Sequence, residues 1–314
     1  MRASSKFKFL RFVVGRHDLP FYYSHSADMQ LSFFDSFLKE NDHGGWKSGK
    51  QPKVRLCLRK GDCGVDDPKR ELQFLSRDET DWPIPDTDYT KFYLTAGQKL
   101  SKKGDSSERT FSYDALNGYY FDTTLHRIRL ADSFRIPLVF TYETLSLTEI
   151  TGHIVAHLVV SCSSAGNAKP PSEIDLFVTL RKVKASGQEV FYTGTMGDPV
   201  PIVKGWQRVS LRKVDTTHPS HTEFLPYRKY YSTDVLPVEA GERYAVDVEI
   251  WPTNVVLEEG EKLVLEIAGH DTQGVGNFSH GHAEDRNPEK LSGMNHIHVG
   301  GENAWLLLPL IPTR

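Results

Sequence analysis

Residues 139–183, VFTYETLSLTEITGHIVAHLVVSCSSAGNAKPPSEIDLFVTLRKV, decide the fold of this chain. They contain two alternating apolar runs, 154–160 and 176–180, separated by a loop rich in serine, glycine and proline. Side chains along a strand point alternately to its two faces, so both runs are predicted to be strands. The first run is apolar on nearly both faces, which suits a strand near the middle of a sandwich. The residues predicted to share one face within each run are Ile154, Ala156, Leu158 and Val160, and Leu176, Val178 and Leu180.

The rest of the sequence is typical of a mainly β protein with one clear helix. Residues 6–14 alternate well enough to form a strand. Met29, Phe33 and Phe37 then recur every four residues, which predicts an amphipathic helix. Beyond this helix, many short strands bounded by glycine and proline favour a β-sandwich of the jelly-roll type. Residues 98–118 are polar and without a period, so we expect a long surface loop there.

The composition limits the classes of function. The chain has 314 residues, of which 39% are hydrophobic and 25% charged, and its formal net charge is -3. This charge argues against a broad nucleic-acid-binding surface. No apolar run approaches the roughly 20 residues of a membrane helix, so we expect no membrane partner. Three cysteines, Cys57, Cys63 and Cys162, do not make a disulfide framework, which predicts a cytoplasmic location.

Two histidine pairs near the C-terminus have metal-like spacing. His280 and His282, and His296 and His298, are each two residues apart, which places both rings of a pair on one face of a strand. Four imidazoles could hold zinc. The alternative is that they hydrogen-bond the backbone and nearby carboxylates. No cysteine or carboxylate spacing supports a metal, so we expect neither a metal nor a cofactor.

The motifs of hydrolases and nucleotide-binding proteins are missing from the sequence. It has no Gly-x-Ser-x-Gly nucleophile elbow, no Walker loop, no Gly-x-Gly-x-x-Gly and no His-Glu-x-x-His. His17 is a candidate general base, because it follows a predicted strand and precedes the predicted helix, where hydrolase triads commonly place their histidine. An ordinary turn histidine would occupy the same position. The sequence thus offers a candidate base without a nucleophile.

Several segments together resemble the CocE/NonD-type hydrolases, relatives of the X-Pro dipeptidyl-peptidases, and the likeness is closest to fungal-looking members. Each segment is short, but they occur in the family's order across almost the whole chain. They are FFDSFLK at 33–39, GGW at 44–46, PKVRL at 52–56, KFYL at 91–94, LTEITG at 147–152, EIDLFV at 173–178, NHIHVGG at 295–301 and LLLP at 306–309.

The resemblance implies a division of the chain into two parts. Residues 1–50 would be the C-terminal remnant of an α/β-hydrolase domain, one strand and one helix, and residues 51–314 the jelly-roll domain. In this family the triad runs serine, aspartate, histidine, and the histidine lies just before the helix that leads to the jelly roll. His17 matches that place. The serine, the acidic partner and the oxyanion hole would then lie upstream of Met1.

These observations predict the C-terminal sandwich portion of a serine hydrolase that acts on small esters or amides. Alone, the chain is expected to be inactive, because a base without a nucleophile cannot carry out acyl transfer. The expected partner is a separately encoded catalytic half or a second copy of the chain. A truncated gene, a split enzyme and a repurposed protein all remain open. The alternative is a non-catalytic binding or accessory protein, for example in fungal secondary-metabolite (polyketide or toxin) biosynthesis.

Overall fold

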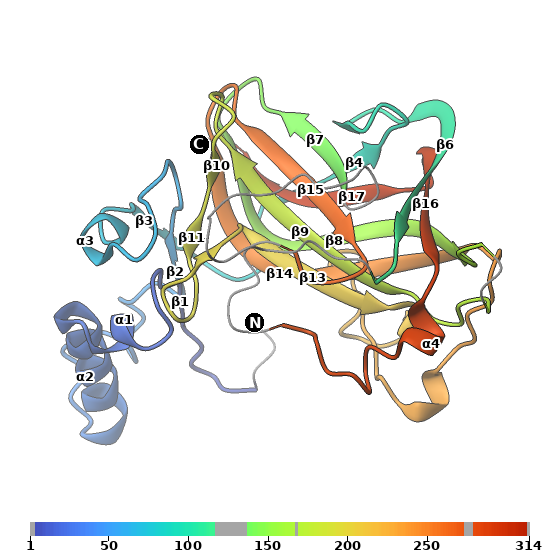
Figure 1. The fold of residues 1–314 in the computed structure, drawn as a ribbon. Coiled ribbons are helices and arrows are strands. Elements are labelled where there is room, and N and C mark those ends of the chain that lie inside the picture. The colour runs from blue at the N-terminus through green and yellow to red at the C-terminus, as the bar shows by residue number, and fades with distance from the viewer. Residues whose placement is uncertain (1–3, 117–136, 167–168, 273–278, 313–314) are drawn as a thin grey trace.

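The computed structural model describes residues 4–116, 137–166, 169–272 and 279–312. Figure 1 shows a small N-terminal lobe beside a large β-sandwich. Strands dominate the chain, which confirms the mainly β fold predicted from the sequence. Within the described residues, no helix is long and apolar enough to cross a membrane.

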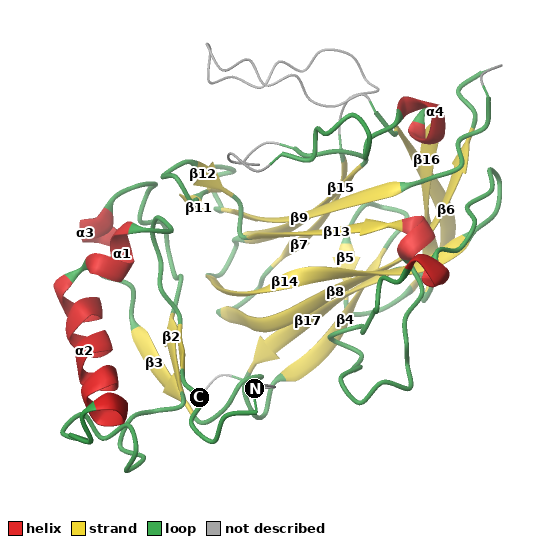
Figure 2. Cartoon of the chain, turned by 90° about the horizontal axis from the view of Figure 1, so that it is seen from below, coloured by secondary structure: helices red, strands yellow, loops and turns green. Residues whose placement is uncertain are grey.

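The N-terminal lobe is a three-stranded sheet with helices on the side away from the sandwich (Figure 2). β1 pairs in parallel with β2, and β2 pairs antiparallel with β3. The domain boundary predicted between residues 50 and 51 lies between β1 and β2, which are joined by hydrogen bonds. The lobe contains β1 (Leu10–Arg11), α1 (Leu19–Tyr22), α2 (Ser24–Leu38), β2 (Val54–Cys57), α3 (Pro68–Glu71) and β3 (Ser76–Glu79).

The predicted helix and first strand are both present in the lobe, with different lengths. The helix predicted around Met29 is α2, 15 residues long. The strand expected over residues 6–14 is only two residues long, because backbone pairing with β2 is limited to Leu10 and Arg11. Side-chain alternation over residues 6–14 therefore overestimated the paired length.

The sandwich is built from two antiparallel halves. One half runs in the order β5-β4-β17-β8-β14, with β16 and β6 added beside β8, and the other runs β13-β9-β15-β7. Its strands are β4 (Asp88–Leu94), β5 (Leu100–Ser101), β6 (Asp105–Asp114), β7 (Leu138–Glu143), β8 (Thr148–Ser163), β9 (Asp175–Val183), β10 (Glu189–Val190), β13 (Val203–Arg208), β14 (Tyr244–Leu257), β15 (Lys262–Ala268), β16 (Met294–Gly301) and β17 (Trp305–Ile311). The hairpin strands β11 (Tyr192–Thr193) and β12 (Pro199–Val200), the short helix α4 (Pro288–Leu291) and the 3-10 turns Val209–Leu211 and Ser232–Asp234 complete the sandwich.

The two runs that decided the fold are confirmed as β8 and β9. They lie in different halves and do not pair with each other: β8 pairs with β14, β16 and β17, and β9 with β10, β13 and β15. Their predicted inner faces share one buried apolar cluster that fills the space between the halves. Burial of these side chains on folding is the main source of stability for such a core.

The two halves of the sandwich are joined at two seams. At one seam Gly205 of β13 pairs with Ile250 of β14, and at the other an isolated bridge joins Lys99 to Thr141. The first seam needs glycine, because a Cβ at position 205 would lie 2.4 Å from the carbonyl oxygen of Glu249. With both edges closed in this way, the sandwich is barrel-like.

The prediction of a surface loop over residues 98–118 is wrong for most of that segment. Residues 105–114 form β6, a ten-residue strand that pairs with β16. Most side chains of β6 are exposed and polar, so no apolar period marks it in the sequence. Its backbone pairing with β16, nearly 200 residues away, decides its structure. Residues 117 and 118 lie outside the described residues.

Candidate functional site

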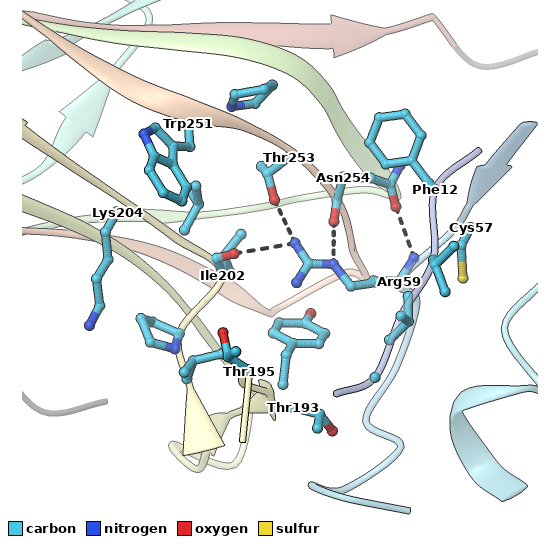
Figure 3. A pocket seen from close by; sticks show the side chains of 18 of the residues that line it. Phe12, Cys57, Arg59, Thr193, Thr195, Ile202, Lys204, Trp251, Thr253 and Asn254 are labelled. Carbon is cyan, nitrogen blue, oxygen red and sulfur yellow. Dashed lines mark hydrogen bonds between the residues drawn. The ribbon is translucent and has the colours of Figure 1, made fainter. Parts of the chain in front are cut away.

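A cleft of about 820 Å³ lies between the N-terminal lobe and the sandwich. Its lobe side is formed by the chain that follows β1 and by the end of β2, including Phe12, His17 and Cys57. Its sandwich side is formed by the β11–β12 hairpin, β13 and the bulged part of β14. A volume of this size is typical of small-molecule sites. Figure 3 shows Phe12 and Cys57 at one end of the cleft and Lys204 and Trp251 at the other.

Arg59 crosses the floor of the cleft and ties the lobe to the sandwich (Figure 3). Its backbone N–H donates to Asn254 Oδ1 at 2.9 Å, and its Nε donates to the carbonyl oxygen of Asn254 at 2.7 Å. Its Nη2 donates to Thr253 Oγ1 at 2.5 Å and to the Ile202 carbonyl at 3.3 Å. The guanidinium also lies 4.1 Å from the ring centroid of Tyr192. The backbone N–H, Nε and Nη2 of Arg59 all donate to the sandwich, so this residue fastens the lobe to the sandwich.

Two tryptophans line the sandwich end of the cleft. Trp206 lies on β13, and Trp251 lies on a bulge where the register of β14 against β8 shifts. Their ring centroids are 5.5 Å apart and the rings are nearly perpendicular. Lys204 precedes Trp206 by two residues and therefore shares its face of the strand. Burial lowers the pKa of Lys204 to about 8. This end can hold an apolar, planar group beside the polar side chains of Lys204 and His280.

His17 lies at the lobe side of the cleft with its side chain exposed. Its backbone N–H donates to the carbonyl oxygen of Thr195 in the β11–β12 hairpin at 3.1 Å. Its imidazole makes no hydrogen bond to another described residue. The structure therefore places the ring where it can face a further group, and its role as a base stays a prediction.

The other histidines that the structure describes do not gather into one site. His157 Nδ1 contacts Asp247 Oδ1 at 2.6 Å on the outer face of the sandwich, and the ring stacks on Trp305. His280 contacts Asp271 and is the one member of the C-terminal pairs that reaches the cleft. Over the ranges that the structure describes, no group of three or more histidine, cysteine or acidic side chains is arranged to hold a metal ion.

His296 and His298 instead join three strands through hydroxyl groups. His298 Nδ1 lies 2.9 Å from Thr110 Oγ1 of β6, and its Nε2 lies 2.8 Å from Ser161 Oγ of β8. His296 makes the corresponding pair of contacts, to Ser112 at 2.7 Å and Ser163 at 2.8 Å. Burial lowers the pKa of both rings, and that of His298 to about 4, with smaller contributions from Arg243 and His296. Both rings are thus neutral cross-links between strands.

We expect the stability of the sandwich to fall as the pH is lowered from about 6.5 towards 4. In the unfolded chain these histidines take up protons near pH 6.5, whereas in the folded chain His298 resists protonation down to about pH 4. For His298 the loss is about 2 kcal/mol after allowing for partial solvent exposure. Urea unfolding at pH 7 and pH 4.5 measures it. The difference in the free energy of unfolding between the two pH values should be smaller in His298→Gln. It should be unchanged in His282→Gln, because the His282 side chain is exposed. Equal pH dependence in all three proteins would contradict the assignment.

The comparison with known families decides the classification. The family model for the X-Pro dipeptidyl-peptidase C-terminal non-catalytic domain matches residues 45–308. This chain belongs to that family. Among X-Pro dipeptidyl-peptidase C-terminal domains, it is similar to those of the CocE/NonD-type hydrolases, as the sequence segments indicated. Nothing in the comparisons bears on a fungal origin.

Two curated relatives and two solved structures show how far the similarity extends. The chain is 27% identical to cocaine esterase of Rhodococcus sp. (strain MB1 Bresler) over 318 residues, which cover 91% of this chain and 46% of the esterase. It is 27% identical to a putative serine esterase of Mycobacterium tuberculosis, covering 79% of this chain and 36% of that protein. The chain thus spans about half or less of the length of these relatives.

The solved structures support the fold. A CocE/NonD family hydrolase from Staphylococcus aureus matches with a TM-score of 0.77 and 24% identity, covering 98% of this chain and 50% of the hydrolase. An aminopeptidase from a Thaumarchaeota archaeon matches with a TM-score of 0.57 and 12% identity, covering 96% of this chain and 47% of the aminopeptidase. Sequence reasoning identified the family, and its assignment of His17 as a base stays a prediction. It missed Arg59, Lys204, Trp206 and Trp251, which form the cleft only through contacts distant in sequence.

Proposed function

We propose that this chain is the C-terminal part of a CocE/NonD-type serine hydrolase that cleaves small esters or amides, and that it supplies His17 as the general base. The position of His17 at the edge of the cleft carries the proposal. A histidine there can take the proton from a serine presented by a catalytic half and return it to the leaving group. Alone, the chain lacks that serine and is inactive.

The N-terminal lobe has a surface suited to a catalytic half. Leu31, Phe34 and Leu38 share one face of α2 and are between 51% and 75% exposed, whereas the buried residues of this helix are Ser26 and Ser36. In an amphipathic helix the exposed stripe would be polar. Among the described strands, β1 pairs only with β2 and leaves its other edge open. Parallel strands of α/β proteins are covered on both faces, so an adjoining α/β-hydrolase sheet would complete the lobe.

The lining of the cleft supports the proposed substrate class. Trp206 of β13 and Trp251 of β14 provide apolar contacts, and Lys204 lines the cleft two residues before Trp206. Aromatic walls with few polar groups favour a small ester or amide that carries an apolar group.

Co-expression with the catalytic α/β-hydrolase halves of family members from the same organism tests this proposal. We expect a one-to-one complex by light scattering and hydrolysis of p-nitrophenyl esters that neither half shows alone. Phe34→Asp on the exposed stripe should prevent the complex, while Met196→Ala, an exposed residue of the sandwich, should not. No complex and no hydrolysis with any half would contradict the proposal. A dimer abolished by Phe34→Asp would identify a second copy of this chain as the partner of the stripe instead.

A further inference from the structure

We propose that the β11–β12 hairpin, residues 192–200, is a positioning element that holds the loop 15–18 carrying His17. This inference rests on the proposed function, since it gives the sandwich a role in orienting the general base. Three independent contacts join the hairpin to the loop or to the residues that support it. Each involves a different hairpin residue, namely Thr193, Thr195 and Gly197.

The first two contacts act on the loop directly. The Thr195 carbonyl accepts the backbone N–H of His17 at 3.1 Å, so the base is fixed at its own peptide group. Gly197 has a φ of +90°, and a Cβ there would lie 2.7 Å from Nε of Arg16. The guanidinium of Arg16 therefore packs directly on the hairpin backbone, at a position where any side chain would push it away.

The third contact is a relay through Thr193. Its Oγ1 accepts the backbone N–H of Asp66 at 2.9 Å and donates to the carboxylate of Glu71. Asp66 in turn accepts two hydrogen bonds from Arg16, at 2.7 and 2.6 Å, and these bonds lower the pKa of Asp66. Thr193 thus positions the carboxylate that holds Arg16 against the hairpin.

Glu71 also limits the loop before His17. Gly15 has a φ of +115°, and a Cβ at this position would lie 2.9 Å from Glu71 Oε2 and 3.0 Å from Cγ of Pro20. The loop is consequently held at residues 15, 16 and 17, while the His17 ring stays exposed. Fixed backbone with a free ring is the arrangement that pre-organises a catalytic group, and a displacement of about 1 Å can cost about 100-fold in rate.

Two variants loosen the hairpin contacts in different ways. Thr193→Val removes both hydrogen bonds of the hydroxyl while keeping the shape of the side chain, and Gly197→Val forces Arg16 away. Met196→Ala, at the exposed tip of the same hairpin, is the matched control. In the full chain alone, amide hydrogen exchange at His17 should become at least about tenfold faster in both variants and stay unchanged in the control. Unchanged exchange at His17 in both variants would overturn the inference without any reference to activity.

In the complex with a catalytic half, both variants should lower kcat by about 10- to 100-fold with little change in KM, since the base is displaced while the apolar end of the cleft at Trp206 and Trp251 is unchanged. Thr193→Ser, which keeps the hydroxyl, should restore most of kcat. If His17 proves essential but both hairpin variants keep wild-type kcat, the positioning role fails and the proposed function stands. If His17 proves dispensable, the proposed function fails, and the exchange result alone decides whether the hairpin holds the loop.

Discussion

His17→Ala is expected to lower ester hydrolysis by the assembled enzyme about 10⁴- to 10⁶-fold. Loss of one triad member removes most of the rate enhancement that the triad provides, because serine, base and acid act as a unit. Stability should change by less than about 0.5 kcal/mol, since the His17 side chain is exposed and makes no hydrogen bond within the described part of the chain. Steady-state hydrolysis and thermal unfolding of the same preparations measure both effects.

His25→Ala is the control for this experiment. His25 is also exposed and lies eight residues further along, on α2, where it lines a different cavity. We expect its replacement to leave hydrolysis within a factor of about two. Full activity in His17→Ala, together with a large loss in His25→Ala, would show that the base had been assigned to the wrong histidine.

Lys182→Ala is expected to destabilise the folded chain by about 3–5 kcal/mol. The Lys182 side chain is fully buried at the end of β9, where its Nζ lies 2.8 Å from Glu261 Oε2 and donates to the Val256 carbonyl at 2.9 Å. Removing the ammonium leaves the Glu261 carboxylate, itself 8% exposed, without its counter-ion. Desolvation of an unpaired charge is the large penalty here, while the net value of the intact pair is much smaller.

Urea unfolding compares this variant with two others. Lys184→Ala breaks a pair with Asp62 whose side chains are 32% and 25% exposed, so its cost should be about 1 kcal/mol or less. The double replacement Lys182→Met with Glu261→Gln should cost less than Lys182→Ala, because no charge is left unpaired. If Lys182→Ala and Lys184→Ala lowered the free energy of unfolding by the same small amount, breaking the buried pair would cost no more than breaking an exposed one.

The sequence predicted the parts of this fold that local patterns encode. Alternation identified β8 and β9, and the four-residue apolar recurrence identified α2. The same patterns did not predict the structure where contacts with residues distant in sequence determine it. Lys182 falls on the inner face of β9, a position that alternation assigns to an apolar residue. It is paired there with Glu261, from the turn just before β15, which carries the opposite charge. β6 was not predicted as a strand, because the partner that pairs with it, β16, lies far along the chain.

The candidate site shows the same division. His17 could be named from its place between a strand and a helix, but its support could not, since Thr195 lies 178 positions away. Trp251 reaches the cleft because the register of β14 shifts between Ile250 and Thr253, and no apolar pattern announces such a bulge. The contacts that shape the cleft are backbone hydrogen bonds and ion pairs between distant residues, and they form only when the chain folds.

The seam at Gly205 and Ile250 makes the cleft sensitive to the shape of the whole sandwich. Trp206 and Trp251 directly follow these two residues, so each indole belongs to a different half of the sandwich and is anchored one peptide from the junction. The second seam, at Lys99 and Thr141, holds the opposite edge closed. Any change in the angle between the halves must then alter the spacing of the two indoles. We therefore expect tryptophan fluorescence to change when the angle between the two halves changes.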